Sequence, residues 1–199
     1  MVYSQFTIEK IKSELGYQVI ESFGTFASLP LAVVSPFLTD LLTRFTPLAL
    51  SIDTEKARSE YIVAPILFEL KSQLKNQVSL FSGREFNVNA DLGLTGYCDF
   101  LISQSTEQLL IEAPVLTLVE AKNDNIASGL GQCMAEMIAA QMFNQQKGQA
   151  LECIYGVVTT GTNWKFLRLR DRAIEIDLNE YFLSDLAKLF GILQHCVGH

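Results

Sequence analysis

The sequence is poor in charged residues and poorer still in positive ones. Charged residues make up 19% of the 199-residue chain, and 15 Lys and Arg stand against 22 Asp and Glu, for a net charge of −7. Typical soluble domains contain about 25% charged residues. Proteins hold nucleic-acid phosphates through Lys and Arg, which displace counterions. Binding of nucleic acid by overall charge is therefore excluded, and such a role would need a local basic surface, a bound metal or a partner.

Several common catalytic motifs are also missing. The chain has no Gly-x-x-x-x-Gly-Lys-Ser/Thr loop, no Gly-x-Gly-x-x-Gly loop and no Gly-x-Ser-x-Gly elbow. Nucleotide binding by a glycine loop and serine-hydrolase chemistry are therefore unsupported. Gly129 and Gly131 lack a third glycine, so this pair indicates helix entry or close packing. The two histidines, His195 and His199, lie near the C-terminus, where tail disorder is the default expectation and a catalytic base is not.

Cysteine usage and the absence of long apolar runs bear on the compartment. Cys98, Cys133, Cys153 and Cys196 show no Cys-x-x-Cys spacing and sit in apolar surroundings, which predicts reduced packing cysteines. No secretory signal is visible at the N-terminus. The longest uncharged stretch, residues 22–39, contains two prolines and several hydroxyl residues, so a buried segment is expected rather than a membrane span. We expect a cytoplasmic protein that does not use a membrane.

Hydrophobic residues make up 49% of the chain, which is ample to offset chain entropy and predicts one folded domain over residues 1–199. Residues 1–53 are expected to form a helical extension packed on the core, with Ser35 and Pro36 starting a helix. This helix is expected to run to about Phe45, and Asp53 and Thr54 begin a second helix that is expected over 54–76. Strands are expected at 85–90, 95–103, 115–122, 152–160, 164–170 and 173–177, and further helices at 128–145 and 183–195. This order predicts an α/β core over 54–177, with a mixed sheet flanked by helices, and a C-terminal helix within 178–199.

Charged residues break the apolar pattern at three places in this predicted core. Asp99 is the only charge in an apolar strand, where a buried Asp without a partner costs several kcal/mol. Glu120 and Lys122 end the next strand and point to the same side of it. On a helical wheel, Glu60 shares a face with apolar residues, Phe68 among them, and Glu55 lies on the opposite face. We expect all four side chains to meet in the core.

Two interpretations of this cluster remain open. Each residue taken alone is explained by a buried ion pair, which often stabilises little. Together, three carboxylates and one lysine leave an excess of negative charge in an apolar setting, and a divalent cation with oxygen ligands would compensate it. Mg²⁺ or Mn²⁺ suits a site made of carboxylates alone.

These residues resemble the PD-(D/E)XK nuclease superfamily, which has the restriction-endonuclease-like fold. The motif reads Gly96-Tyr-Cys-Asp99, a gap of twenty residues, and then Glu120-Ala-Lys122. Cys98 stands where the family name has Pro. The segment 59–68 is similar to the opening helix of the nuclease module in type I restriction subunits. The resemblance covers about residues 54–170 and implies a similar core with an additional helical N-terminal segment.

The resemblance implies metal-dependent hydrolysis of a phosphodiester, with DNA as the expected nucleic acid. Asp99 and Glu120 would hold Mg²⁺ or Mn²⁺ together with the backbone carbonyl of Ala121, and Glu60 would complete the site. Such a metal would polarise the phosphate and lower the pKa of a bound water. Lys122 would orient the water or stabilise the transition state. The sequence does not decide between DNA and RNA, single and double strands, or one and two metal ions.

Substrate contacts are expected from two further places. Gln132 and Glu136 share a helix face, where a substrate role and a solvent-facing polar stripe are equally supported. A basic run contains Lys165, Arg168 and Arg170, and it predicts either a solvated sheet edge or a phosphate-tracking surface. Trp164 beside it is expected at the rim of the fold or stacked on a base.

Two other functions compete with the nuclease hypothesis. The chain would be a catalytically silent binding or assembly subunit of a DNA-processing complex, or a purely structural interaction domain. The acidic composition and the lack of a DNA-reading module favour the first, and the apolar N-terminal helices favour the second. The sequence leaves open a partner protein subunit and a homo-oligomer.

Overall fold

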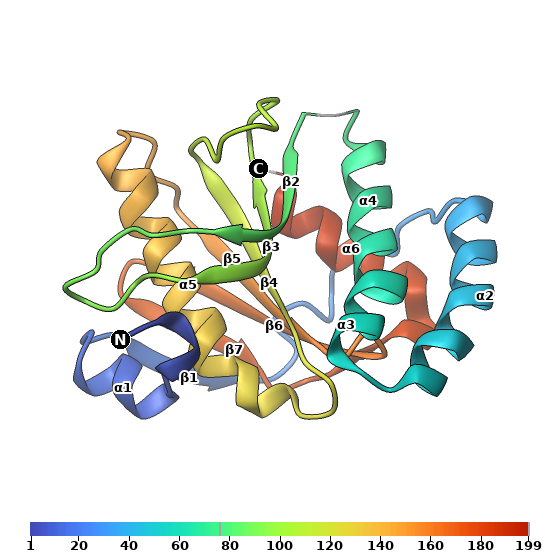
Figure 1. The fold of residues 1–199 in the computed structure, drawn as a ribbon, viewed down its shortest axis with the longest axis horizontal. Helices are drawn as coiled ribbons and strands as arrows, with labels where there is room; N and C mark the ends of the chain where they lie inside the picture. The colour runs from blue at the N-terminus through green and yellow to red at the C-terminus, as the bar shows by residue number, and fades with distance from the viewer. Residues whose placement is uncertain (76, 199) are drawn as a thin grey trace.

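The computed structural model describes residues 1–75 and 77–198 and has an eight-stranded mixed sheet at its centre (Figure 1). The strands are β1 (Gln18–Ser22), β2 (Ser79–Glu85), β3 (Tyr97–Ser103), β4 (Val115–Ala121), β5 (Ile154–Thr159), β6 (Asn163–Arg170), β7 (Ala173–Asp177) and β8 (Tyr181–Phe182). The α-helices are α1 (Ile8–Ser13), α2 (Pro36–Ile52), α3 (Glu55–Arg58), α4 (Ala64–Gln73), α5 (Ile126–Gln146) and α6 (Leu186–Val197). A π-helical turn, Ser59–Val63, joins α3 to α4, and short 3₁₀ turns cover Tyr3–Gln5 and Leu183–Asp185.

The strand order is β1-β7-β6-β5-β4-β3-β2, with β8 paired to β6. Strands β2, β3 and β4 pair antiparallel, as do β5, β6 and β7, whereas β4 pairs parallel with β5. Helix α5 is the crossover between these two parallel strands, as a parallel pair requires. The crossover carries the chain from the end of β4 over the face of the sheet to the start of β5.

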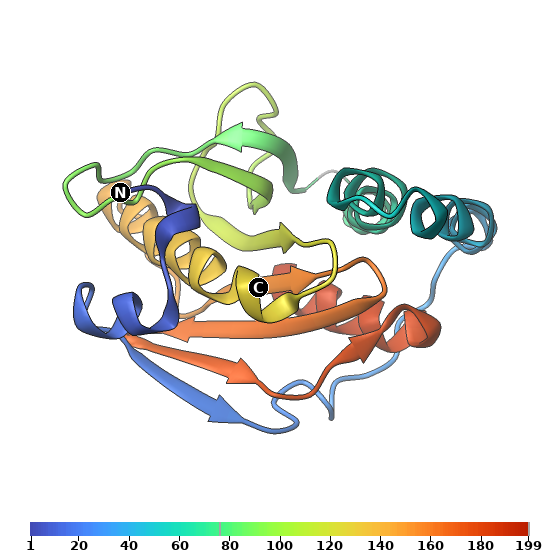
Figure 2. The ribbon, with the colours of Figure 1, turned by 60° about the horizontal axis from the view of Figure 1, so that its bottom comes forward.

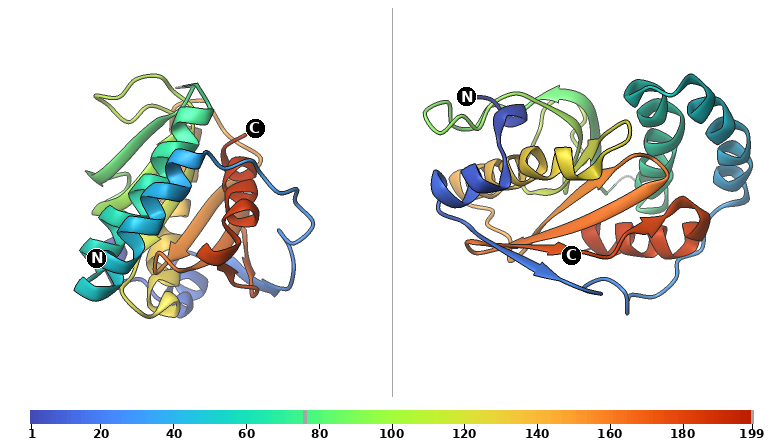
Figure 3. Two further views of the ribbon diagram at one scale, coloured as in Figure 1. Left: turned by 90° about the vertical axis from the view of Figure 1, so that its right-hand side faces the viewer. Right: turned by 90° about the horizontal axis from the view of Figure 1, so that it is seen from below.

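The two faces of the sheet carry separate apolar cores. One core joins α1 and α5 to inward-facing residues such as Leu118, Val158 and Leu167. The other joins α2, α4 and α6 to residues such as Val119, Val157 and Phe166. Figures 2 and 3 show α5 on one side of the sheet and α6 on the other, with α2 and α4 side by side at one end. Where the two cores alternate between adjacent residues, as at Leu118 and Val119 of β4, the face of the next polar strand residue follows from these neighbours.

The sequence prediction of an α/β chain with a mixed sheet flanked by helices is confirmed. The expected helix caps are also present: the Ser35 hydroxyl accepts from the Leu38 N–H at 3.1 Å, and the Thr54 hydroxyl accepts from the Ala57 N–H at 3.1 Å. Helix α2 continues beyond the expected end at Phe45, through Pro47 to Ile52. Residue 76, the expected end of the second helix, and His199 lie outside the described residues.

Two expectations about the strands were wrong. Residues 1–53 were expected to be a helical extension, but β1 lies within them and pairs parallel with β7 at the sheet edge. Its residues alternate poorly between buried and exposed because an edge strand is covered incompletely. The strand expected at 85–90 lies instead at 79–85, where Phe81 is buried and Leu80 is half-buried against the core. No helix among the described residues is long and apolar enough to cross a membrane.

Candidate active site

The candidate site lies where β3 and β4 separate. Their backbone pairing ends at Phe100 opposite Val119. One residue further, the Asp99 carboxylate takes the place of a backbone acceptor, because its Oδ2 accepts from the Ala121 N–H at 2.8 Å. The gap between the strands therefore holds a carboxylate instead of a continuous ladder. This placement explains why an Asp is present in an otherwise apolar strand.

Glu120 and Lys122 form a close ion pair at the end of β4. The Lys122 Nζ lies 2.6 Å from the Glu120 Oε1, and their side chains are 17% and 2% exposed. Glu120 points to the α5 face of the sheet, since its neighbour Leu118 packs in the α5 core. Its second oxygen, Oε2, is buried and accepts no hydrogen bond from any residue that the structure describes. The lysine therefore pairs with only one of the two oxygens of the Glu120 carboxylate.

Glu136 brings a second buried carboxylate to the site from α5. It is fully buried, and its Oε1 accepts from the Gln132 Nε2 at 3.1 Å. Its Oε2 is buried without a hydrogen-bond partner within residues 1–75 and 77–198. Gln132 and Glu136 thus share a face as expected. The interpretation of a solvent-facing stripe was wrong, because the face they share turns toward the sheet.

The carboxylates raise one another's pKa. Burial raises the pKa of Glu136 well above its usual range, and the Glu120 charge adds to this effect while the Gln132 amide opposes it. Burial and the Asp99 charge raise the pKa of Glu120 to about 8, against the opposing pull of Lys122. Burial also raises the pKa of Asp99, although the Ala121 N–H opposes the shift. Three carboxylates and one lysine therefore leave the site short of positive charge.

Lys122 stays charged in this setting. Burial lowers its pKa, but the Glu120 carboxylate, with smaller contributions from Glu55 and Asp99, raises it more, so the net shift is upward. Its aliphatic stem runs beneath Gly129 of α5. A Cβ at Gly129 would lie 2.7 Å from the Val158 Cγ1 and 3.1 Å from the Lys122 Cε, so glycine allows the helix to close over the lysine. This contact bears out the interpretation of close packing for Gly129.

The expected position of Glu60 was wrong. Its side chain is 53% exposed and pairs with Lys56 at 3.0 Å on the outer surface of the helix. The helical wheel failed because residues 59–63 wind as a π-helix, which shifts the phase of every later residue. The same shift leaves Phe68, expected in the core, 60% exposed.

Glu55 is the carboxylate that this helix brings to the site. Its Oε2 lies 4.0 Å from the Lys122 Nζ, and its side chain is half exposed. Sequence reasoning missed it because the wheel placed Glu55 on the face opposite to Glu60. The signal that could have found it is the N-cap at Thr54, which fixes Glu55 as the first residue of α3.

The arginines of β6 lie away from the carboxylates. Arg168 and Arg170 alternate with Leu167 and Leu169, which pack in the α5 core, so both arginines face the α6 side of the sheet. Arg168 pairs with Glu175, and Arg170 pairs with Glu152 at 2.8 Å. The structure therefore separates both arginines from the carboxylates, and substrate binding by them stays a prediction.

Trp164 does not stand at a rim. It is fully buried, and its indole N–H donates to the Gly161 carbonyl at 2.9 Å. The expectation of a rim aromatic or a base-stacking one was wrong, because this strand lies in the middle of the sheet with α6 over its face.

Lys165 is the one member of the basic run that shares a face with Glu120. In the strand register Glu120 pairs with Val158, and Val158 pairs with Lys165. Two strand spacings separate Lys165 from Glu120, or about 10 Å. Its ammonium donates to the Leu178 carbonyl at 2.8 Å and so turns away from the carboxylates. Lys165 therefore borders the site without belonging to the cluster.

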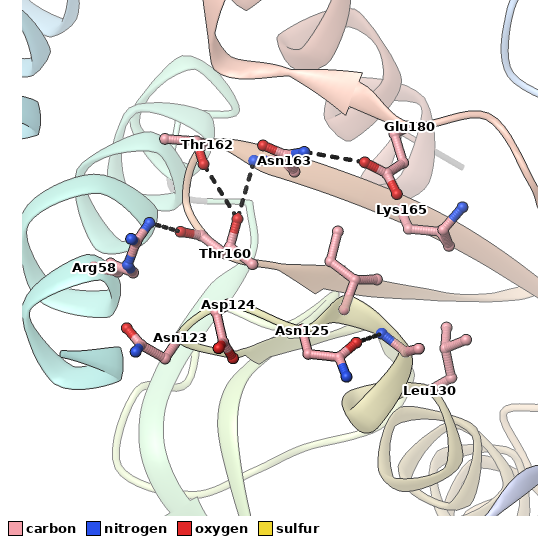
Figure 4. A pocket seen from close by; sticks show the side chains of 12 residues that line it. Arg58, Asn123, Asp124, Asn125, Leu130, Thr160, Thr162, Asn163, Lys165 and Glu180 are labelled. Atoms are coloured by element: carbon pink, nitrogen blue, oxygen red, sulfur yellow. Dashed lines mark hydrogen bonds between the residues drawn. The ribbon is translucent and has the colours of Figure 1, made fainter. Parts of the chain in front are cut away.

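A polar cleft of about 530 Å³ begins directly after Lys122. Figure 4 shows Asn123, Asp124 and Asn125, from the loop before α5, facing Thr160, Asn163 and Lys165 across the cleft. Asn125 also caps α5, since its Oδ1 accepts from the Ala127 N–H at 2.9 Å. A binding space therefore lies next to the ion pair.

The donor set of the site fits a hard divalent cation. Among the described residues, no three His, Cys, Asp or Glu side chains are placed to hold a metal ion by themselves. Mg²⁺ does not need three, because it usually keeps several waters and takes one or two carboxylates together with substrate phosphates. Asp99 and Glu120 supply two carboxylates, and the unpaired Glu120 Oε2 is the buried oxygen that a cation would satisfy. The Ala121 N–H, rather than its carbonyl, is the backbone group seen to act here.

No protein-family model matches the chain, and a search of curated proteins found no match.

Proposed function

We propose that the chain is a metal-dependent phosphodiester hydrolase acting on DNA, with a restriction-endonuclease-like fold and a cytoplasmic location. One observation carries the proposal. Asp99, Glu120 and Lys122 converge where two strands separate, and the buried carboxylates retain oxygens without partners. An Asp followed by Glu-x-Lys at the end of the next strand is the pattern that resembles the PD-(D/E)XK superfamily. Among the residues that the structure describes, the cluster contains no histidine, which agrees with chemistry that needs no histidine base.

Asp99 and Glu120 would hold the cation, Mg²⁺ or Mn²⁺. When bound, the cation supplies polarisation of the phosphodiester and a more acidic water. Asp99 is oriented for this role because the Ala121 N–H holds one of its oxygens and leaves the other. Glu120 is oriented by Lys122 in the same way. Each ligand is therefore positioned through one oxygen and remains able to bind through the other.

Lys122 stabilises negative charge that develops on the phosphate. Its ammonium is held between Glu120 and Glu55, and its side chain is 17% exposed, so a substrate can reach it. A preorganised charge of this kind is worth about 10²- to 10³-fold in rate. Glu136 belongs to the same buried carboxylate cluster as Glu120, and Gln132 fixes its orientation. DNA and a protein subunit are the proposed partners.

Cleavage of DNA by the purified protein in Mn²⁺ tests the proposal. We expect Asp99→Asn and Lys122→Met each to lower the rate by about 10²-fold or more. Asp40→Asn is the matched control, because Asp40 is an exposed aspartate on α2 that pairs with Arg44 of the same helix. A wild-type rate in Asp99→Asn would refute the assignment.

A structural role is the second candidate, because the buried ion pair between Glu120 and Lys122 is itself observed. Breaking a buried pair that stabilises the fold costs about 3–5 kcal/mol, and a purely structural domain would lose that much in Lys122→Met. A metal site would in addition be stabilised by Mn²⁺, because a cation that binds only the folded state raises the free energy of unfolding, whereas a purely structural domain would not. Urea unfolding of the wild type and Lys122→Met with and without Mn²⁺ distinguishes the two.

A further inference from the structure

The proposed hydrolase has two clefts on opposite sides of its carboxylates. The polar cleft described above opens after Lys122, toward β5 and β6. A second cleft, of about 700 Å³, lies on the β2–β3 side and is lined by Tyr97, Gly96 and Gln132, among others. Gln132 connects this second cleft to the site, since its amide donates to Glu136. In the order of the strands, the carboxylates of β3 and β4 therefore stand between the two clefts.

Tyr97 is an exposed aromatic residue beside the site. It is the first residue of β3, two positions before Asp99, and 65% of its surface is exposed. The core does not need the Tyr97 ring, because Cys98 and Leu101 are the residues of this strand that pack in the α5 core. Exposed aromatic rings next to a backbone-binding site are the platforms on which single-stranded bases stack.

The polar cleft suits a nucleoside better than a bare phosphate. Arg58 and Lys165 line it together with Asp124 and Glu180, so its charges balance. Amide and hydroxyl groups make up much of the rest, including Asn123 and Thr162. Its volume lies within the 300–1,000 Å³ that is typical of small-molecule sites. A base can enter such a cleft only when it is unstacked.

The rest of the surface does not favour a duplex. Duplex binding without base readout relies on several Lys and Arg contacts to phosphates. The arginines of β6 are neutralised by Glu175 and Glu152 on the far face of the sheet. Arg172 is also engaged, since it donates to the Leu15 carbonyl at 2.6 Å and lies over the Tyr17 ring. The groups beside the carboxylates are thus suited to bases rather than to a duplex backbone.

We propose that the substrate is single-stranded nucleic acid, with one nucleotide in the polar cleft after Lys122 and a base on the other side of the carboxylates stacked on Tyr97. This inference rests on the proposed hydrolase function and specifies its substrate. A double-stranded substrate reaches the site only where its strands are frayed or a base is turned out.

Fluorescence anisotropy with the metal chelated tests the inference without hydrolysis. The probes are a labelled DNA strand of ~15 nucleotides, near the upper end of single-strand site sizes, and the same strand annealed to its complement. We expect the single strand to bind at least about tenfold more tightly than the duplex. Tyr97→Ala should weaken single-strand binding about tenfold, and Tyr97→Phe should retain it, because stacking needs the ring and not the hydroxyl. Phe23→Ala is the control, since Phe23 is 78% exposed and lines neither cleft.

The polar cleft has its own matched pair of variants. Ala127 and Ser128 are both exposed in the first turn of α5, but only Ala127 lines the cleft. Ala127→Trp should block the cleft and weaken single-strand binding about tenfold, by loss of the contacts that one nucleotide makes. Ser128→Trp should leave it unchanged.

Equal or tighter binding of the duplex, or wild-type binding by both Tyr97→Ala and Ala127→Trp, would overturn the inference and leave the hydrolase proposal standing. Failure of both probes to bind would overturn it as well. Metal binding and cleavage by the Asp99 variants report separately on the hydrolase function, so the two failures are distinguishable.

Discussion

Asp177 and Glu136 are both fully buried acidic residues, yet their surroundings differ. The Asp177 carboxylate accepts from four donors: the N–H groups of Gly24, Phe26 and Asn179, and the Tyr181 hydroxyl, at 2.9–3.2 Å. Glu136 accepts from one donor, Gln132, and the structure gives its second oxygen no partner among the described residues. One carboxylate is saturated and the other is not.

The difference separates a carboxylate that holds the fold together from one that costs stability. Buried polar groups are nearly always hydrogen-bonded, and an exception calls for an explanation. Asp177 ties the loop after β1 to the end of β7, so it joins segments about 150 residues apart in the chain. Glu120 and Glu136 tie nothing together through their free oxygens. We interpret those oxygens as retained for a ligand, and three predictions sharpen or break the comparison.

The largest effect is expected at Asp177. Asp177→Ala leaves two backbone N–H groups of the β1 loop and the Tyr181 hydroxyl without their acceptor. Because each buried unsatisfied group costs about 1–3 kcal/mol, we expect the free energy of unfolding to fall by about 3–5 kcal/mol in urea titrations. A loss below about 1 kcal/mol would show that Asp177 is not the structural carboxylate described here.

Glu136→Gln should change the free energy of unfolding in the opposite direction, toward greater stability. Burial and Glu120 raise the pKa of Glu136 in the folded protein, so the folded state binds a proton that the unfolded state releases above the ordinary Glu pKa. The wild type therefore loses stability as pH rises from that value toward the raised pKa, and glutamine does not.

Unfolding of the metal-free proteins at several pH values checks this. We expect the stability of Glu136→Gln, relative to wild type, to increase between pH ~4 and ~8, at about 1.4 kcal/mol for each unit by which the pKa is raised. Glu14→Gln, a change at an exposed glutamate, should show no such trend. A constant difference between Glu136→Gln and wild type across the pH range would contradict the account of an unsatisfied carboxylate.

The smallest effect is expected on the far face of the sheet. Arg168 and Glu175 are 33% and 22% exposed, and such partly exposed pairs contribute about 0–1 kcal/mol. Arg168→Gln should therefore change the free energy of unfolding by less than about 1 kcal/mol. It should also leave binding of the DNA strand unchanged, because Arg168 faces away from the carboxylates. A loss of binding as large as that expected for Tyr97→Ala would show that the substrate contacts the α6 face of the sheet, and it would contradict the proposed placement beside the carboxylates.

The central sheet was predictable because its strands are buried and apolar. Strand β7 lies at the expected residues, and β4 and α5 differ from the expected bounds by one or two residues. The prediction failed at the edges. Strand β1 pairs only with β7, and its polar residues hide the period of a strand. Strand β2 ends where the predicted strand was to begin. The prediction missed β2 because Gly83 and the polar residues after it are exposed and interrupt the apolar pattern of a buried strand.

The candidate site was predictable where chemistry follows strand position. Asp99, Glu120 and Lys122 stand out as charges in apolar strands, and the structure brings them together. Glu60 was predicted wrongly because no local pattern marks the π-helical turn that rotates it outward. The burial of Glu136 could not be read from α5, because every residue from Cys133 to Ala140 is buried and no exposed face marks that part of the helix.

A calorimetric titration of Mn²⁺ into the chelator-stripped protein tests the central claim most directly. Metal binding requires neither the correct substrate nor a partner subunit. We predict saturable binding by the wild type, loss of that binding in Asp99→Asn, and retention of it in Asp40→Asn, whose aspartate is 64% exposed on α2. Equal binding by Asp99→Asn and the wild type, or no binding by the wild type, would contradict the claim that the unpaired carboxylates form a cation site.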